Sequence, residues 1–331
     1  MTSPFFVAGF IAAIVLLAAT VASAEPYKVD AGLSKVTTRD EDWRDEKRDR
    51  VIPVRLYLPA DVGKPAPVIL VSHGLGGTRT AMAYAADHWS SHGYVVIALQ
   101  HPGSDDGVWR NAGTPNEKLA AMREAANGAN LILRLNDVRF ALDHLQLLTQ
   151  EGGVLAGKID LTKVGIAGHS FGAQTVQAVI GQRLGRPQLS LPSKADARIK
   201  AAVAFSPNFR GGDAEGAFAN VKVPCFHFTG TRDNVSLIRD TTLEQRRVPF
   251  DNIRAPGQRL ITFEGGDHRV FSGNSLPTTD TAKYARFHDL ICQSTTAFWD
   301  AELLGDAKAK TWLNDAMADE VGDEGKVESH D

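Results

Sequence analysis

The chain has 331 residues, 43% of them hydrophobic, and a formal net charge of -3 at pH 7. This length allows one large domain with a substantial core, since single domains of the α/β class often reach about 250 residues. The nearly balanced charge and the lack of any basic run exclude the electrostatic footprint of a nucleic-acid-binding protein.

The first 24 residues have the pattern of a signal peptide. An apolar run from 5 to 22 leads into Ala22-Ser23-Ala24, and a polar chain begins at Glu25. Small residues at the first and third positions of this triplet fit cleavage after Ala24. We therefore expect a secreted or periplasmic protein with no membrane span after cleavage. An N-terminal membrane anchor is the alternative, because no Lys or Arg precedes the run and its length approaches that of a spanning helix.

Short apolar runs alternate with helical patterns over most of the remaining chain. After β-type segments between 27 and 58, the apolar runs lie at 68–72, 94–99, 164–167, 201–205, 223–229 and 259–263. Helical patterns separate several of them, at 81–91, 131–148 and 173–184. Buried strands that alternate with helices predict the α/β class, with a mostly parallel central sheet and helices on both faces. No composition break marks a linker, so we expect one domain over 25–318.

Two segments do not follow this alternation. Residues 101–130 contain several glycines and prolines, and we expect an irregular segment that covers a pocket, because long loops in compact domains are usually functional. His101 opens the segment and Trp109 is its largest apolar side chain, so each is a candidate pocket residue, with structural packing as the alternative. The last residues, 319–331, are mostly acidic or small and predict a disordered tail.

The chain has two cysteines, Cys225 and Cys292. An exported protein could join them in a disulfide. Cys225 lies inside an apolar run, where a free buried thiol is common. The sequence leaves both possibilities open.

Gly168-His169-Ser170-Phe171-Gly172 matches the pattern G-x-S-x-G. It directly follows an apolar run and directly precedes a helical pattern, which is the strand–turn–helix context of a nucleophile elbow. The start of a helix behind Ser170 also favours the negative charge that develops during an acyl transfer. We therefore predict that Ser170 is a nucleophile.

A second glycine-rich segment, His73-Gly74-Leu75-Gly76-Gly77, follows the first apolar run. In a site of this kind, one oxyanion-binding N–H comes from the residue after the nucleophile and another from an upstream loop. These positions are Phe171 and Leu75.

The acid and the base are expected to follow the nucleophile in the order Asp/Glu, then His. Asp233 comes after the run 223–229, and His268 comes after the run 259–263. Because the carboxyl ends of parallel strands meet at one edge of a sheet, both side chains are expected near Ser170.

The sequence offers other acids and histidines besides these two. Asp213 is an alternative acid, although the end of the preceding run, Ser206-Pro207-Asn208, carries no carboxylate. Asp267 is expected to shape the loop beside His268. His169 is expected to pack next to Ser170 or to line the pocket. The sequence shows no metal-ligand spacing and no dinucleotide fingerprint, so we expect neither a metal nor another cofactor.

Taken together, these motifs resemble the α/β-hydrolase superfamily, over roughly residues 51–304. The closer resemblance is to the branch that holds dienelactone hydrolases, polyester hydrolases with cutinase-like esterases, and platelet-activating factor acetylhydrolases. The segments around His73 and Ser170 are most similar to the acetylhydrolases. The position of Asp233 is more similar to that of the acid in the polyester hydrolases.

The resemblance implies hydrolysis of a small-molecule, lipid or polyester ester through an acyl-enzyme on Ser170, with His268 as general base and acid and Asp233 as the orienting acid. A peptidase, thioesterase or amidase on the same scaffold is an alternative. A non-catalytic binding protein of the same fold is another, although such a protein typically lacks one of the three residues. The sequence leaves the natural substrate and the oligomeric state open.

Overall fold

The computed structural model describes residues 25–28, 30–32, 34–60, 64–185, 195–234, 241–273 and 280–330. The expected signal peptide, residues 1–24, lies outside these ranges. Among the described helices, none is long and apolar enough to cross a membrane.

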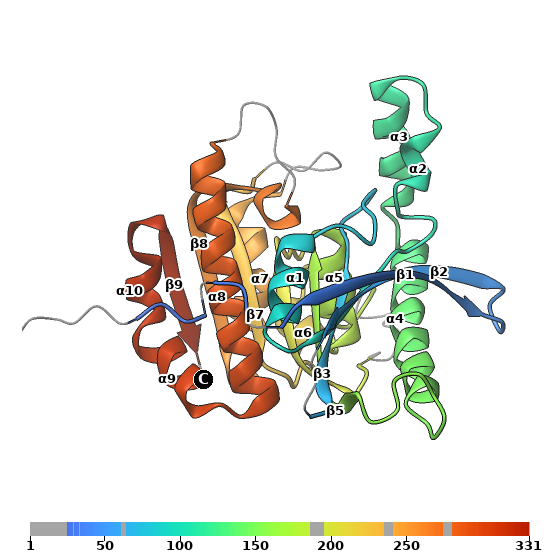
Figure 1. Ribbon diagram of the computed structural model, residues 1–331. Coiled ribbons are helices and arrows are strands. Elements are labelled where there is room, and N and C mark those ends of the chain that lie inside the picture. The colour runs from blue at the N-terminus through green and yellow to red at the C-terminus, as the bar shows by residue number, and fades with distance from the viewer. Residues whose placement is uncertain are drawn as a thin grey trace, which may run out of the picture.

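The described residues form a nine-stranded sheet in the order β1-β2-β4-β3-β5-β6-β7-β8-β9 (Figure 1). The strands are β1 (Val36–Asp45), β2 (Arg50–Pro59), β3 (Ala66–Ser72), β4 (Val95–Leu99), β5 (Ile159–His169), β6 (Ile199–Phe205), β7 (Cys225–Arg232), β8 (Gln258–Asp267) and β9 (Gly325–His330). Strands β3 to β8 run parallel to their neighbours, whereas β1 and β2 at one end and β9 at the other are antiparallel. The expected α/β class with a mostly parallel sheet is confirmed.

Helices cover both faces of this sheet and give it two apolar cores. On one face lie α4 (Gly128–Leu148), α5 (Phe171–Val179), α6 (Ala214–Phe218) and α7 (Leu243–Asn252). The other face is covered by α1 (Ala83–Ser91), α8 (Thr281–Leu304), α9 (Ala307–Asp315) and α10 (Met317–Val321). Strands β3 and β4 are buried along their whole length, which explains why they appear in the sequence as continuous apolar runs.

The segment 101–130 is more regular than the sequence predicts. It contains α2 (Gly107–Arg110), α3 (Pro115–Ala125) and the first turn of α4 (Figure 1). Helix α3 begins with a capping box, in which the Thr114 and Glu117 side chains each accept from the other's backbone N–H, and with Pro115 in its first turn. These are strong local start signals for a helix. The prediction of an irregular segment was wrong for this reason.

The prediction of a disordered tail over 319–331 was also wrong. Its residues complete α10, form the short helix η3 (Gly322–Glu324) and then add β9 to the edge of β8. Backbone pairing with β8 makes this segment a strand, although its acidic and small residues predict disorder. Two contacts fix the strand: Glu328 pairs with Arg247 at 2.6 Å, and His330 Nε2 donates to the Phe250 carbonyl at 2.8 Å.

Both cysteines are free and buried. Cys225 on β7 belongs to the core beneath α4 and α5, whereas Cys292 lies on α8 at the opposite face of the sheet. The sheet therefore separates the two thiols, and burial raises the pKa of each.

Candidate active site

Ser170 lies in the sharp turn between β5 and α5. Its backbone has φ 56 and ψ -112, a conformation that non-glycine residues rarely adopt. A Cβ at Gly168 would lie 2.5 Å from the Gly172 carbonyl oxygen, and one at Gly172 would collide with the Ser72 carbonyl. The turn that presents Ser170 therefore requires glycine at both flanking positions.

Ser170, His268 and Asp233 form one chain of hydrogen bonds. Asp233 follows β7 and His268 follows β8, so all three lie beyond the carboxyl ends of parallel strands. His268 Nε2 is 2.9 Å from Ser170 Oγ, and His268 Nδ1 is 2.8 Å from Asp233 Oδ1. This arrangement can transfer a proton from the serine hydroxyl to the imidazole.

Asp233 is fully buried and held by further donors. The Thr229 hydroxyl donates to Oδ2 at 3.0 Å, and Arg246 Nη2 lies 3.0 Å from Oδ1. Burial alone would raise the pKa of Asp233, but the hydrogen bond from His268 and the charge of Arg246 hold that pKa below its ordinary value. Asp233 is therefore an anion at neutral pH.

The alternative acid, Asp213, is engaged elsewhere. It caps α6 by accepting the Gly216 N–H at 2.9 Å, and it pairs with Arg183 near the surface. Asp267, the residue next to His268, accepts the Arg269 N–H at 2.8 Å and so shapes the loop.

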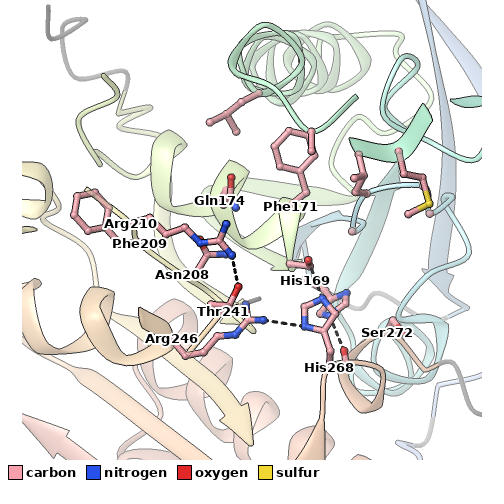
Figure 2. Close-up of a pocket in the computed structure, with 18 of the residues that line it drawn as sticks. His169, Phe171, Gln174, Asn208, Phe209, Arg210, Thr241, Arg246, His268 and Ser272 are labelled. Atoms are coloured by element: carbon pink, nitrogen blue, oxygen red, sulfur yellow. Dashed lines mark hydrogen bonds between the residues drawn. The ribbon is translucent and has the colours of Figure 1, made fainter. Parts of the chain in front are cut away.

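A cavity of about 530 Å³ opens beside Ser170. Figure 2 shows part of its wall, with Phe171 and Phe209 well apart and His268 beside Arg246. The apolar residues that line it are Leu75, Ala81, Met122, Ala126, Leu131, Phe171, Leu184 and Phe209. The polar residues are His169, Ser170, Gln174, Gln182, Asn208, Arg210, Thr241, Arg246, His268, Arg269 and Ser272.

Leu75 and Phe171, the two expected oxyanion-hole residues, both line this cavity next to Ser170. The following two amides of the upstream loop are already used, since the Gly76 N–H donates to the Ser104 carbonyl at 2.9 Å and the Gly77 N–H to the Gly74 carbonyl at 3.1 Å. The first bond ties the loop to the segment after β4, and the second closes a turn within the loop.

Of the three candidate pocket residues, only His169 belongs to the described wall of the cavity. Its Nε2 donates to the backbone carbonyl of His268 at 2.9 Å, and the two rings lie 4.6 Å apart. Burial holds the pKa of His169 well below its ordinary value. His169 is therefore a neutral donor that fixes the position of His268.

His101 and Trp109 were expected as pocket residues, and the structure places both away from the described wall. His101 is fully buried beneath the loop, with Nε2 3.0 Å from Ser72 Oγ and Nδ1 3.0 Å from Asp137 Oδ2. Trp109 Nε1 donates to the Gly76 carbonyl at 2.8 Å. Both side chains support the loop that carries Leu75, because His101 bonds to Ser72 before the loop and Trp109 bonds to Gly76 within it.

Arg134 on α4 is a supporting residue that the sequence analysis missed. Its guanidinium is fully buried and donates to the His73 carbonyl, to Ser104 Oγ at 3.0 Å and to Thr175 Oγ1 at 3.1 Å. It also lies 4.8 Å from the centre of the Phe171 ring. Arg134 thus connects the loop before Leu75 to the helix after Ser170.

Arg246 on α7 was missed as well. Both arginines occupy the buried stripe of their helix: Arg134 shares it with Val138 and Ala141, and Arg246 shares it with Pro249 and Phe250. An arginine at an apolar position of a helix is a signal that could have found them, because a buried cation requires partners.

Comparison with known proteins agrees with the resemblance noted above. The model of the family described as platelet-activating factor acetylhydrolase, isoform II, matches residues 49–111. This stretch runs from β2 through the Leu75 loop to α2.

Curated relatives carry the name platelet-activating factor acetylhydrolase. The protein from Cavia porcellus is 28% identical over 152 residues, which are 38% of this chain and 34% of that protein. The protein from Canis lupus familiaris is 26% identical over 39% of this chain and 35% of its own length. The protein from Bos taurus is 24% identical over 67% of this chain and 51% of its own length. The chain thus spans between a third and about half of the length of these relatives, and it resembles the acetylhydrolase branch of the α/β hydrolases.

Proposed function

We propose that this protein is a serine hydrolase that cleaves a carboxylic ester. The observation that carries the proposal is the continuous chain from Ser170 Oγ through His268 to Asp233, with links of 2.9 and 2.8 Å. The name acetylhydrolase, which the relatives share, supports an ester rather than a peptide as substrate.

In the proposed reaction, Ser170 Oγ attacks the ester carbonyl carbon while its proton passes to His268 Nε2. Asp233 accepts the Nδ1–H of His268, which fixes the tautomer and stabilises the imidazolium that forms. The N–H groups of Leu75 and Phe171 stabilise the carbonyl oxygen as it becomes an oxyanion.

The tetrahedral intermediate then collapses, and its bond to the alcohol oxygen breaks. His268 gives its proton to that oxygen, which leaves an acyl group on Ser170. A water molecule next loses a proton to His268 and attacks the acyl carbon. The acid departs, the proton returns to Ser170 Oγ, and the enzyme is restored.

The size of the cavity supports a small-molecule or single lipid ester as substrate, since cavities of about 300–1,000 Å³ hold ligands of that size. Leu75, Met122 and Phe171 provide apolar contacts, while Asn208 and Gln174 provide polar ones.

A series of 4-nitrophenyl esters with increasing acyl chain length tests this function. We expect hydrolysis by the native enzyme and a fall in kcat of roughly 10⁴–10⁶ in Ser170→Ala, with the fold retained in circular dichroism. A thioester and an anilide with the same acyl group test the thioesterase and amidase alternatives. Hydrolysis that survives in Ser170→Ala, or no hydrolysis of any of these substrates by the native enzyme, contradicts the proposal.

We also propose that the protein is exported and that its mature chain begins at Glu25. The apolar run and Ala22-Ser23-Ala24 support this, although they lie outside the described residues. N-terminal sequencing of the protein from its native host is expected to give Glu25. An intact Met1 in the membrane fraction would favour the anchor instead.

A further inference from the structure

We propose that Arg134 is a positioning residue that holds the two N–H groups of the oxyanion hole at a fixed separation. This inference rests on the proposed function, in which the Leu75 and Phe171 N–H groups stabilise the oxyanion. Both residues line the cavity beside Ser170, and among the described residues neither N–H donates to a backbone carbonyl. Leu75 lies in a loop and Phe171 begins α5, so no single element fixes both donors.

The Arg134 guanidinium holds the backbone on both sides of Leu75. Nη2 donates to the carbonyl of His73, two residues before Leu75, and Nη1 donates to Ser104 Oγ at 3.0 Å. The Ser104 carbonyl in turn accepts the N–H of Gly76, the residue after Leu75, at 2.9 Å. One side chain therefore fixes the loop before Leu75 directly and after Leu75 through Ser104.

The same guanidinium also holds the start of α5. Nε donates to Thr175 Oγ1 at 3.1 Å, and the Thr175 hydroxyl donates to the carbonyl of Phe171 at 3.0 Å. The guanidinium carbon lies 4.8 Å from the centre of the Phe171 ring, within the range of a cation–π contact. The three nitrogens of Arg134 thus connect the Leu75 donor with the Phe171 donor.

Burial leaves Arg134 little freedom to change these contacts. Its side chain is fully buried, so a nitrogen that lost its partner would be shielded from water, which is unfavourable. The loop also packs directly on the nucleophile turn, since a Cβ at Gly74 would lie 3.5 Å from Ser170 Cβ. Because an oxyanion hole requires its donors about 2.7–3.1 Å from the oxyanion, a small shift of the loop would lower the rate.

A pair of inhibitors separates this role from a contribution to the stability of the fold. The first is a trifluoromethyl ketone with the acyl chain of the best 4-nitrophenyl ester. Ser170 Oγ forms a bond to its carbonyl carbon, the serine proton passes to His268 Nε2, and an electron pair of the C=O bond moves to the oxygen, which becomes an oxyanion. The corresponding carbinol has the same skeleton but no carbonyl carbon to attack. The ratio of the two inhibition constants therefore measures oxyanion stabilisation.

Arg134→Gln is expected to raise the inhibition constant of the ketone about 10- to 100-fold, somewhat less than the roughly 10²–10³ that the loss of a whole donor costs. The kcat for a 4-nitrophenyl ester is expected to fall by a similar factor, whereas the inhibition constant of the carbinol changes less than about threefold. Arg134→Lys keeps the charge but lacks the forked geometry that reaches three acceptors, so most of the loss is expected to remain. Sulfonyl fluoride labelling to its end point counts the folded sites in each preparation.

Arg259→Gln is the matched control. Arg259 on β8 is also a buried arginine that donates to a backbone carbonyl, that of Leu313 at 3.0 Å, but it is not among the described residues that line the cavity. We expect this variant to lower the melting temperature and to leave the ratio of the two inhibition constants unchanged. A change of the ratio in Arg134→Gln alone supports the positioning role.

An unchanged ratio in a folded Arg134→Gln overturns the inference, even if its melting temperature falls. Full recovery in Arg134→Lys overturns it as well, since charge alone would then be sufficient. If Arg134→Gln does not fold, Thr175→Val removes the contact to α5 at nearly constant volume. The ratio is then expected to change by about threefold or more, and an unchanged ratio overturns the inference. A native enzyme without Ser170-dependent hydrolysis would instead reject the proposed function.

Discussion

Three donors from three different elements converge on the carboxylate of Asp233: the His268 imidazole, the Thr229 hydroxyl and the Arg246 guanidinium. This set holds a buried anion in one orientation, which an acid that orients a histidine requires. Asp213, by contrast, lies at the surface end of α6, where its loss would remove only a helix cap and an exposed ion pair.

A comparison of two substitutions tests this difference. Asp233→Asn is expected to lower kcat by roughly 10³–10⁴, because the amide no longer stabilises the imidazolium of His268. Asp213→Asn is expected to change kcat less than twofold, since asparagine also caps helices well. Steady-state kinetics on one ester decides between them, and a silent Asp233→Asn with an inactive Asp213→Asn would reverse the assignment.

The sequence was sufficient to predict that Ser170, Asp233 and His268 lie together, because each follows a strand of one parallel sheet in the expected order. It was not sufficient for Arg134 or Arg246. Their partners are mostly backbone carbonyls and hydroxyls from other elements, and such contacts leave no pattern in the linear chain.

At the scale of elements, the segment from α2 to α3 supports the Leu75 loop and also contributes to the cavity. Trp109 donates to the Gly76 carbonyl, and a Cβ at Gly76 would lie 2.8 Å from Trp109 Nε1. Met122 of α3 lines the cavity instead. One short segment thus holds an anchor and a residue of the cavity wall.

Two alanine variants separate these tasks. Trp109→Ala is expected to lower the melting temperature by a few degrees without changing the ranking of ester chain lengths, since it removes the hydrogen bond to Gly76 and the packing of a partly buried side chain, a loss of about 1–3 kcal/mol. Met122→Ala is expected to change the ranking in favour of longer chains, with a smaller loss of stability. Thermal unfolding and the 4-nitrophenyl ester series measure both effects. The account of Trp109 fails if its variant changes the ranking at an unchanged melting temperature.

Helix α3 and strand β9 show why two elements were not predicted. The capping box at Thr114 is a local signal, but the glycines and prolines around it indicate a loop. Strand β9 has few apolar residues, and only the open edge of β8 makes it a strand. The capping box alone is enough to predict α3. Strand β9 cannot be predicted locally, because its pairing partner β8 is distant in sequence.

At the scale of the whole molecule, several buried histidines are held neutral. Burial lowers the pKa of His101 and of His227 to about 4, and it lowers those of His73 and His169 well below their ordinary value. Burial alone would raise the pKa of Asp137 on α4, but bonds from His101 and Arg50 hold that pKa below its ordinary value.

These shifts predict that the free energy of unfolding decreases as the pH is lowered below about 6.5. Unfolded histidines bind protons below about pH 6.5, whereas the buried ones do not until about pH 4, so the unfolded chain takes up more protons within this window. Below about pH 4, protonation of the unfolded Asp137 adds to the loss. We expect the melting temperature to drop by roughly 5 °C or more between pH 7.5 and pH 5. A melting temperature that is constant or rises over this range contradicts the assignment of neutral buried histidines.

Covalent labelling tests the central claim, that Ser170 is a nucleophile activated by His268, most directly. The native enzyme is treated with a sulfonyl fluoride, and the modified peptide is identified by mass spectrometry. We predict one label per chain, on Ser170, formed much more slowly in His268→Ala and not at all in Ser170→Ala. A label on another residue with ester hydrolysis intact, or equal labelling in His268→Ala, would contradict the account.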